Sequence, residues 1–269
     1  MLAGQRQKLI LDEVRRRGAV RVSELTELLD VSDMTVRRDL DVLASTGLVD
    51  KVHGGATAPG HLSADEPGFE AKSHRQLDEK ELIARRAAKL VEPGQAIGLT
   101  AGTTTWRLAH HLRDVPSLTI VTNSIQVANV LNAEPRPDLT VILTGGVRTP
   151  SDALVGPVAV ATLRSLHVDV LFLGVHGMSL SQGFSTPNLL EGETDQAHID
   201  AAERVVVVAD HTKWNVRGLS RIAPLSAADV LITDPALEAS AVKALQGKVG
   251  RLIVATPDAR RLRATGSSS

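Results

Sequence analysis

The sequence predicts an α/β protein in two domains, a small helical one followed by a larger one built on a parallel sheet. Three observations support this. Short helical patterns occupy the front of the chain, a polar stretch with two Pro-Gly pairs follows, and seven apolar runs of strand length then alternate with helical patterns. We therefore expect a first domain at residues 1–57, a linker at 58–75, a second domain at 76–256 and a disordered tail at 257–269.

The stretch at residues 31–56, VSDMTVRRDLDVLASTGLVDKVHGGA, predicts a helix followed by a strand and a tight turn. Ser32 suits a helix N-cap because its hydroxyl can accept a hydrogen bond from a free backbone N–H, and Gly47 suits the helix end. Apolar side chains recur at helical spacing, which predicts one buried stripe along this helix. The stripe consists of Val36, Leu40 and Leu43.

The other side of this helix is polar and carries two adjacent arginines, Arg37 and Arg38. On a helical wheel Met34, Arg38 and Asp41 face away from the buried stripe, while Thr35 and Arg37 lie on its flanks. Arginine can bind guanine edges through two hydrogen bonds or clamp phosphates, so this side suits the major groove of DNA. An Arg-Arg pair on a helix is usually only part of a solvated surface, and the residues before this helix are needed to favour DNA contact over that alternative.

Two helical patterns precede this helix, at Gln5–Arg17 and after the cap residue Ser23. Residues 48–53 then alternate like a strand, and the Gly-Gly pair after them predicts a turn. Three short helices followed by a β-wing are typical of a winged helix-turn-helix, which binds double-stranded DNA.

The composition limits the function classes. The net charge is −1, and residues 1–55 hold as many acidic as basic side chains. DNA affinity must therefore come from arginines on the contact face, with the acids behind them, and from dimerisation. The chain has no cysteine, and His110-His111 point about 100° apart on a helix, so we expect no metal site. No apolar run approaches the roughly 18 residues of a membrane span, and no signal peptide is evident, so we expect a cytoplasmic, nucleoid-associated protein without membrane contact.

The seven apolar runs predict a parallel sheet with helices on both faces. In such sheets ligands bind beyond the carboxyl ends of the strands, so we expect functional residues directly after the runs. The runs lie at residues 96–99, 118–121, 139–143, 168–173, 205–208, 230–232 and 252–254.

The loop after the first run, TAGTTT, predicts an anion site. Gly102 lets the backbone approach a ligand, and free N–H groups at the start of the following helix favour an anion. The hydroxyls of Thr103, Thr104 and Thr105 can add hydrogen bonds to phosphate oxygens. The alternative is that these threonines only cap the helix.

Other polar residues follow later runs and suit a shared cleft. Asn123 follows the second run, and Gly145-Gly146 forms a close-approach turn after the third. Lys213, after the fifth run, can neutralise a phosphate, and Asp210 or Glu191 can accept hydrogen bonds from sugar hydroxyls.

Residues 6–56 closely resemble the N-terminal domain of DeoR-family bacterial transcriptional regulators, because the stretch at 31–56 matches that family's signature nearly residue for residue. The resemblance implies a DNA-facing side on the helix and a wing that carries Lys51 and His53. The expected DNA-binding residues are Ser32, Met34, Thr35, Arg37, Arg38, Lys51 and His53.

The second domain resembles the DeoR-family effector domain, which is similar in fold to ribose-5-phosphate isomerase and binds phosphorylated sugars or related metabolites. The matching stretches are AGTTT, VTNS, LTGG, residues 169–177, STPN with Glu191, ADHTKW and IAPLSAADVLITD. The resemblance implies that the first loop and Lys213 hold phosphate. The expected effector-binding residues are Thr100, Gly102, Thr103, Thr104, Thr105, Asn123, Gly145, Gly146, Glu191, Asp210 and Lys213.

The chain departs from the family's pattern at two positions. Thr100 stands where many relatives carry Asp, and Asp195 stands where many carry Lys. These departures leave the ligand open between a smaller polyol phosphate, a different sugar phosphate and a non-phosphorylated effector.

Together these inferences predict a DNA-binding transcriptional regulator, a repressor of a sugar or polyol catabolic operon, that a phosphorylated sugar controls. We expect it to bind an operator, to associate with itself as a dimer or tetramer, and to need no cofactor. The alternative is a sugar-phosphate isomerase-like enzyme with an accessory DNA-binding domain. We expect no enzyme, because Thr100 lacks the acid that proton transfer beside the phosphate loop would use.

Overall fold

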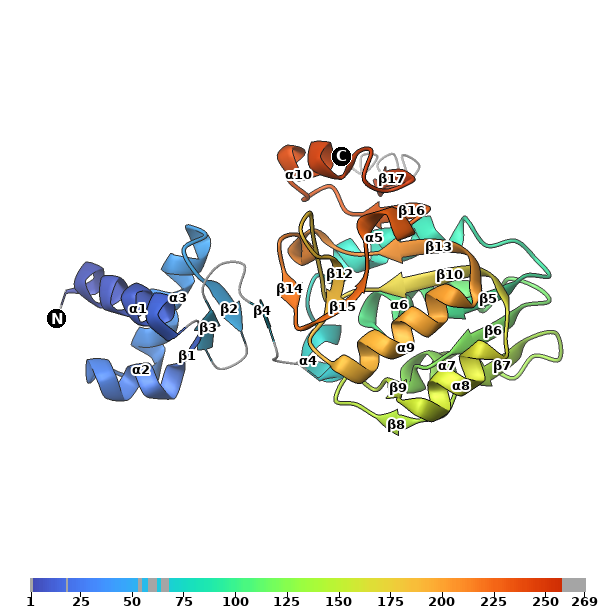
Figure 1. Ribbon diagram of the computed structural model, residues 1–269, viewed down its shortest axis with the longest axis horizontal. Coiled ribbons are helices and arrows are strands. Elements are labelled where there is room, and N and C mark those ends of the chain that lie inside the picture. The colour runs from blue at the N-terminus through green and yellow to red at the C-terminus, as the bar shows by residue number, and fades with distance from the viewer. Residues whose placement is uncertain (1, 18, 53–54, 58–61, 64–67, 258–269) are drawn as a thin grey trace, which may run out of the picture. The chain divides into compact units, whose positions relative to one another are not determined.

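In a computed structural model of the chain, the structure describes residues 2–17, 19–52, 55–57, 62–63 and 68–257. The chain divides into two compact units, Met1–Asp65 and Glu66–Ser269 (Figure 1). The expected tail beyond residue 257 lies outside the described residues, as does His53.

The first unit is the predicted winged helix-turn-helix. Helix α3 ends where Gly47 adopts the left-handed conformation at φ +69°. Val36, Leu40 and Leu43 of α3 are buried in one apolar core with α1 and α2, as their helical spacing predicted. Strands β1, β3 and β2 form an antiparallel sheet in that order. The elements are α1 (Ala3–Arg17), β1 (Ala19–Arg21), α2 (Val22–Leu29), α3 (Asp33–Ser45), β2 (Asp50–Val52), β3 (Gly55–Thr57) and β4 (Leu62–Ser63).

A parallel sheet of seven described strands forms the centre of the second unit, in the order β17-β16-β13-β10-β5-β6-β7. Each of the seven predicted apolar runs overlaps one of these strands, so the prediction of a parallel α/β domain is confirmed. The strands are β5 (Ala96–Leu99), β6 (Thr119–Thr122), β7 (Thr140–Leu143), β10 (Val168–Gly174), β13 (Ala202–Val208), β16 (Val230–Thr233) and β17 (Arg251–Val254).

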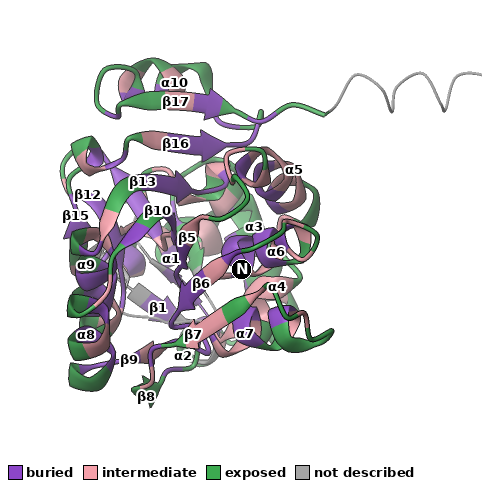
Figure 2. Cartoon of the chain, turned by 90° about the vertical axis from the view of Figure 1, so that its right-hand side faces the viewer, coloured by how far each residue is buried: buried purple, intermediate pink, exposed green. Residues whose placement is uncertain are grey.

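Helices cover both faces of this sheet, as Figure 2 shows with the sheet seen edge-on. Helices α5 (Leu77–Ala88), α6 (Thr103–Leu112) and α7 (Ile125–Asn132) pack side by side on one face. Helices α8 (Pro157–Arg164) and α9 (Leu189–Asp200) pack on the other. Because buried apolar side chains of the strands point to both helical layers, the sheet is a rigid platform for the loops at its carboxyl edge.

Smaller elements complete the second unit. An antiparallel sheet in the order β11-β12-β15 lies beside α9, and β8 pairs with β9. No helix among the described residues is long and apolar enough to cross a membrane. The remaining elements are α4 (Phe69–Ser73), β8 (Val147–Arg148), β9 (Leu154–Val155), β11 (Gly177–Ser179), β12 (Gly183–Thr186), η1 (His211–Lys213), β14 (Arg217–Gly218), β15 (Ser220–Ala223), η2 (Leu225–Ala227) and α10 (Ala239–Leu245).

The expected linker at 58–75 is too long at its carboxyl end, because α4 already belongs to the second unit. The Phe69 ring meets the Trp106 ring of α6 edge-on, with centroids 5.6 Å apart. The backbone N–H of Phe69 donates to the carbonyl of Pro150 at 3.0 Å. These contacts fix α4 beside the loops at the carboxyl edge of the large sheet.

Candidate functional site

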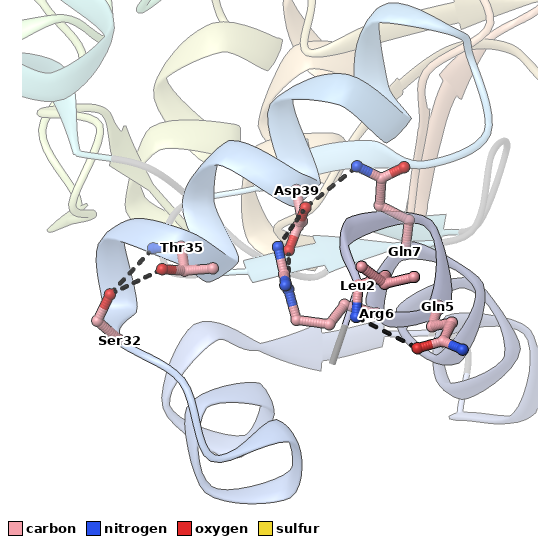
Figure 3. A network of polar contacts seen from close by, with 7 residues as sticks. All are labelled: Leu2, Gln5, Arg6, Gln7, Ser32, Thr35 and Asp39. Atoms are coloured by element: carbon pink, nitrogen blue, oxygen red, sulfur yellow. Dashed lines mark hydrogen bonds and ion pairs between the residues drawn. The ribbon is translucent and has the colours of Figure 1, made fainter.

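Helix α3 presents a polar, solvent-exposed side. Ser32 caps the helix, since its hydroxyl accepts from the backbone N–H of Thr35 at 3.3 Å and lies 2.9 Å from the Thr35 hydroxyl (Figure 3). Met34, Arg37 and Arg38 are exposed, and Thr35 is half-buried. The side of α3 opposite the core therefore carries the residues that the helical wheel assigned to it.

The two arginines differ in their surroundings. The guanidinium of Arg37 pairs with the carboxylate of Asp33, one helical turn earlier, and this contact raises the pKa of Arg37. Arg38 is exposed and has no hydrogen-bond or ion-pair partner within the described part of the chain. The expectation that acids lie behind the arginines is thus wrong for Asp33, whose carboxylate shares their exposed side.

A buried acid on α3 fastens this helix to α1. Asp39 is 3% exposed and accepts from Arg6 Nε at 2.7 Å and from Gln7 Nε2 at 3.1 Å (Figure 3). Asp39 thus lies behind the exposed side of α3, as expected for an acid. Its charge-assisted contact with Arg6 offsets the free-energy cost of burying the carboxylate. The network orients α3 relative to α1 and leaves Arg38 facing solvent.

An ion pair joins the wing strand β2 to helix α3. Lys51 of β2 pairs with Asp41 of α3, and both side chains are about half exposed. Register pairs Lys51 with Ala56 across the hairpin. His53, the other expected wing residue, lies outside the described residues.

A cavity opens at the carboxyl edge of the large sheet in the second unit. Its walls come from loops after β5, β6, β10 and β13, from α4 and from α9. The polar lining includes the first two of the three threonines at the start of α6, and six of the expected effector-binding residues contribute. These six are Gly102, Thr103, Thr104, Asn123, Glu191 and Lys213.

The amino end of α6 points its first turn at this cavity. Its N-cap is Gly102, and no side chain caps the helix. Thr103 and Thr104 line the cavity at the first helical positions. A Cβ at Gly102 would lie 3.2 Å from the Thr105 hydroxyl, so the loop is packed tightly at this point. An uncapped helix start with adjacent hydroxyls can bind an anion such as phosphate.

Two buried polar residues hold the first loop in place. Asn123 Oδ1 accepts from the backbone N–H of Ala101 at 2.8 Å, and its Nδ2 donates to the carbonyl of Leu154 at 3.2 Å. The hydroxyl of Thr100 accepts from the backbone N–H of Gly174 at 3.0 Å, which joins the ends of β5 and β10. The loop is therefore preorganised by its neighbours.

Cationic side chains from α4, α5, α6 and η1 interact electrostatically at and near the cavity. Burial is the main cause that lowers the pKa of Lys80 to about 8; the negative charge of Asp210 opposes this shift, and the positive charges of Lys213, Arg107 and Lys72 add to it. Lys80 Nζ donates to the carbonyls of Lys72 at 2.7 Å and Arg75 at 2.5 Å. Of these cations Lys72 and Lys213 line the cavity, so this part of its wall is positive and can hold an anionic ligand.

Carboxyl groups from α9 form another part of the lining. Glu191 accepts from the hydroxyls of Thr149 at 2.9 Å and Thr186 at 3.0 Å. Asp195 lies one turn later and is 8% exposed. Burial, followed by the nearby charge of Glu191, raises the pKa of Asp195 well above its ordinary value.

Five expected effector-binding residues lie outside the lining of this cavity. Thr100 and Thr105 are fully buried and bond to backbone, the latter donating to the Gly102 carbonyl at 2.9 Å. Asp210 is 1% exposed, and its carboxylate accepts from Thr212. Gly145 and Gly146 also lie outside the lining of the cavity.

The sequence predicts that Gly145-Gly146, after the third apolar run, lets the backbone approach a ligand. In the structure Gly146 instead approaches the backbone of Val155. Gly146 has φ +122°, and a Cβ there would lie 2.5 Å from the Val155 carbonyl oxygen. Glycine is thus needed at this position, directly before β8, because the backbone there passes close to Val155 of β9.

Sequence reasoning missed several cavity residues. Lys72 falls within the predicted linker at 58–75, although Phe69, three residues before it, is an aromatic side chain that can anchor this segment on a domain. In the sequence Asp195 stands out only as a departure from the family's pattern. The lining residues that were not expected include Lys72, Ser151, His176, Thr186 and Asp195. Within the described residues, no group of three or more His, Asp or Glu could hold a metal ion.

Comparison with known proteins agrees with both parts of the chain. A family model described as "DeoR-like helix-turn-helix domain" matches residues 6–61, and one described as "DeoR C terminal sensor domain" matches residues 75–235. The HTH-type transcriptional regulator YgbI of Escherichia coli is 38% identical, over 95% of this chain and 99% of the relative.

Two further relatives from Escherichia coli carry more specific names. A putative aga operon transcriptional repressor is 33% identical over 91% of this chain and 90% of its own length. The glycerol-3-phosphate regulon repressor is 32% identical over 86% of this chain and 90% of its own length. Among solved structures, a D-ribose-5-phosphate isomerase in complex with phospho-erythronic acid is 16% identical, with a TM-score of 0.39 over 51% of this chain and 54% of that one.

Proposed function

The chain belongs to the DeoR family of transcriptional regulators, and from this premise we propose that it represses a sugar or polyol catabolic operon under the control of a phosphorylated sugar or polyol. The observation that supports this most directly is that one chain has both features. Helix α3 of its winged helix-turn-helix carries exposed arginines, and the cavity of its second unit is lined by Lys72 and Lys213. The names of the relatives, a glycerol-3-phosphate regulon repressor and an aga operon repressor, support the same class of effector.

The phosphate of the effector would bind at the start of α6. The free N–H groups of its first turn, the hydroxyls of Thr103 and Thr104, and the Lys213 ammonium provide hydrogen bonds and positive charge. Lys80, which interacts electrostatically with Lys213, adds positive charge. No cofactor is required for this recognition.

Control of DNA binding requires that the effector prefers one state of the protein. Two or more chains associate, as a dimer or tetramer, so that two α3 helices reach adjacent half-sites of an operator. An effector that binds the DNA-free state more tightly releases the operator, with a coupling free energy of about 1–3 kcal/mol. A protein that works on the operator resides with the DNA, in the cytoplasm.

We further propose that the second unit binds its ligand without turning it over. An isomerase with an accessory DNA-binding domain would instead interconvert aldose and ketose phosphates. A coupled isomerase assay with pentose and hexose phosphates separates the two, and turnover of any of them would contradict the regulator proposal as stated.

The experiment that tests the proposal measures DNA binding and its release. Purified full-length protein selects its operator from a random duplex library, and sugar and polyol phosphates are then added to the complex. We expect at least one of them to weaken operator binding between about 5- and 150-fold. If no phosphate ester changes DNA binding or shifts the melting temperature, the effector assignment is wrong.

A matched pair of lysine variants locates the phosphate. Lys213→Ala should weaken effector binding by about tenfold or more, because a charge-assisted hydrogen bond is lost, and should leave operator binding unchanged. Lys248→Ala removes an exposed lysine remote from the cavity lining and should change neither. An unchanged response in Lys213→Ala would remove this residue from the site.

A further inference from the structure

Asp195 is an unusual residue for the wall of a polar cavity. Its side chain lines the cavity and is buried, yet it has no hydrogen-bond or ion-pair partner within the described part of the chain. Burying a carboxyl group without a partner costs free energy. A buried, unpartnered polar group that faces a cavity indicates a ligand group that bonds to it.

The neighbours of Asp195 on α9 are acidic, not basic. Glu191 precedes it by one helical turn and also lines the cavity, and its charge acts on Asp195. No positive side chain contributes to the raised pKa of Asp195. The two carboxyl groups therefore favour a state in which Asp195 keeps its proton and can donate as well as accept a hydrogen bond.

This acidic wall and the cationic region come from different helical layers. Asp195 and Glu191 lie on α9, whereas Lys80 lies on α5 and the uncapped helix start belongs to α6. Figure 2 shows α9 on one face of the sheet and α5 and α6 on the other. A ligand that occupies the cavity across the edge of the sheet meets positive groups on one side and carboxyl groups on the other.

We propose that Asp195 and Glu191 form a second subsite, which binds the end of the effector remote from its phosphate and selects uncharged, hydroxyl-bearing ends over carboxylates and second phosphates. This inference rests on the proposed function and specifies its ligand class. A hydroxyl can accept from protonated Asp195 and donate to Glu191. A carboxylate in the same place would meet like charge in a poorly solvated site.

The test uses pairs of ligands that share a phosphate and differ at the other end. The full-length protein is titrated calorimetrically with glucose 6-phosphate and 6-phosphogluconate, with glycerol 3-phosphate and 3-phosphoglycerate, and with inorganic phosphate. For every pair that binds, we expect the hydroxyl-ended member to bind at least about tenfold more tightly, the equivalent of one well-made hydrogen bond to a charged group. Equal or tighter binding of the carboxylate-ended members would overturn the subsite.

Variants separate this inference from the phosphate site. Asp195→Leu should weaken the hydroxyl-ended esters by about tenfold and leave inorganic phosphate unchanged, while Asp195→Asn, which still donates and accepts, should keep most of the affinity. Asp200→Asn is the control, because Asp200 is exposed on the same helix. Loss of inorganic phosphate binding in Asp195→Leu would assign Asp195 to the phosphate region and overturn the proposal.

The failure of the proposed function gives a different result. If neither inorganic phosphate nor any phosphate ester binds the wild-type protein, the phosphate site itself is wrong and the subsite falls with it. If phosphate binds and the two members of each pair do not differ, only the subsite is wrong.

Discussion

The two units of this chain treat their charges in opposite ways. In the first unit most charged residues of α3 form ion pairs, and two of these pairs, Arg37–Asp33 and Lys51–Asp41, are exposed to solvent, while Arg38 is exposed without a partner within the described residues. In the second unit Lys80 and Asp195 are buried and have shifted pKa values, and Asp195 has no partner within the described residues. The comparison teaches that most charges of a DNA-binding surface can be balanced within the protein before DNA binds. A ligand cavity, in contrast, can keep a buried polar group whose hydrogen-bond partner is supplied only by the ligand.

The largest effect is expected where the first unit does bury a charge. Asp39→Ala removes the carboxylate that accepts from Arg6 and Gln7, and it leaves the Arg6 guanidinium, 15% exposed, without this partner. We expect the free energy of unfolding of the first unit to fall by about 3 kcal/mol, at the lower end for buried pairs because Arg6 is not fully buried. Hydrogen exchange of α1 and α3 in the full chain measures this loss.

An exposed acid on the same helix is the matched control for that experiment. Asp33→Ala removes a carboxylate whose side chain is 59% exposed, and hydrogen exchange should change little. Equal destabilisation by the two substitutions would show that burial does not distinguish the pairs of α3.

The next effect distinguishes the two arginines in DNA binding. Arg38→Ala should weaken operator binding by about tenfold or more if the side chain reads a base. Arg37→Ala should weaken it less, because Arg37 must give up its contact with Asp33 before it reaches DNA. Fluorescence anisotropy with the selected operator measures both, and Arg204→Ala, an exposed arginine of the second unit, is the control. Unchanged binding in both variants would remove α3 as the recognition helix.

Much of the fold was predictable because its signals are local. The stripe of Val36, Leu40 and Leu43 needs only helical periodicity, and Ser32 needs only the chemistry of an N-cap. The inner strands of the large sheet are mostly buried, so they occur in the sequence as short apolar runs, and the more exposed edge strands β7 and β17 are apolar enough to show the same pattern. The order of the strands does not follow from these runs, since it depends on how the helices pack between them.

The site was predictable only in part, because a cavity joins residues that are distant in sequence. Thr103, Thr104 and Lys213 follow strands directly and could be found from that rule. Lys72 reaches the cavity from a short helix in what resembles a linker, and Thr100 looks like a ligand-binding residue although its hydroxyl bonds to backbone. Such roles depend on tertiary contacts that no local pattern records.

A smaller effect tests the cost of the unpartnered carboxyl in the second unit. The pKa of Asp195 is raised in the folded chain, so folding is opposed at any pH where an unfolded Asp, with its ordinary value of 3.8, has lost its proton. Asp195→Asn should therefore raise the free energy of unfolding at pH 7 by about 1 kcal/mol, and the gain should shrink as the pH falls towards that ordinary value.

Denaturant unfolding of the second unit at several pH values measures this gain. The other titratable groups of the cavity lining are Lys72, His176, Glu191 and Lys213, and α9 also buries His198, whose pKa burial lowers to about 3. Asp200→Asn shares this background and should show no such dependence, since Asp200 is exposed. A gain in Asp195→Asn that did not vary with pH would mean that Asp195 does not hold its proton more tightly in the folded state.

The smallest effect is expected at the exposed pair that joins α3 to the wing. Asp41→Asn removes the partner of Lys51, but both side chains are about half exposed, so the free energy of unfolding should change by less than about 0.5 kcal/mol. Operator affinity should rise by up to about threefold at low salt, because a negative charge leaves the DNA-facing side, and the gain should fade as salt screens it. Anisotropy titrations across a salt series measure the gain. A loss of affinity would show that Asp41 holds Lys51 in the position from which the wing contacts DNA.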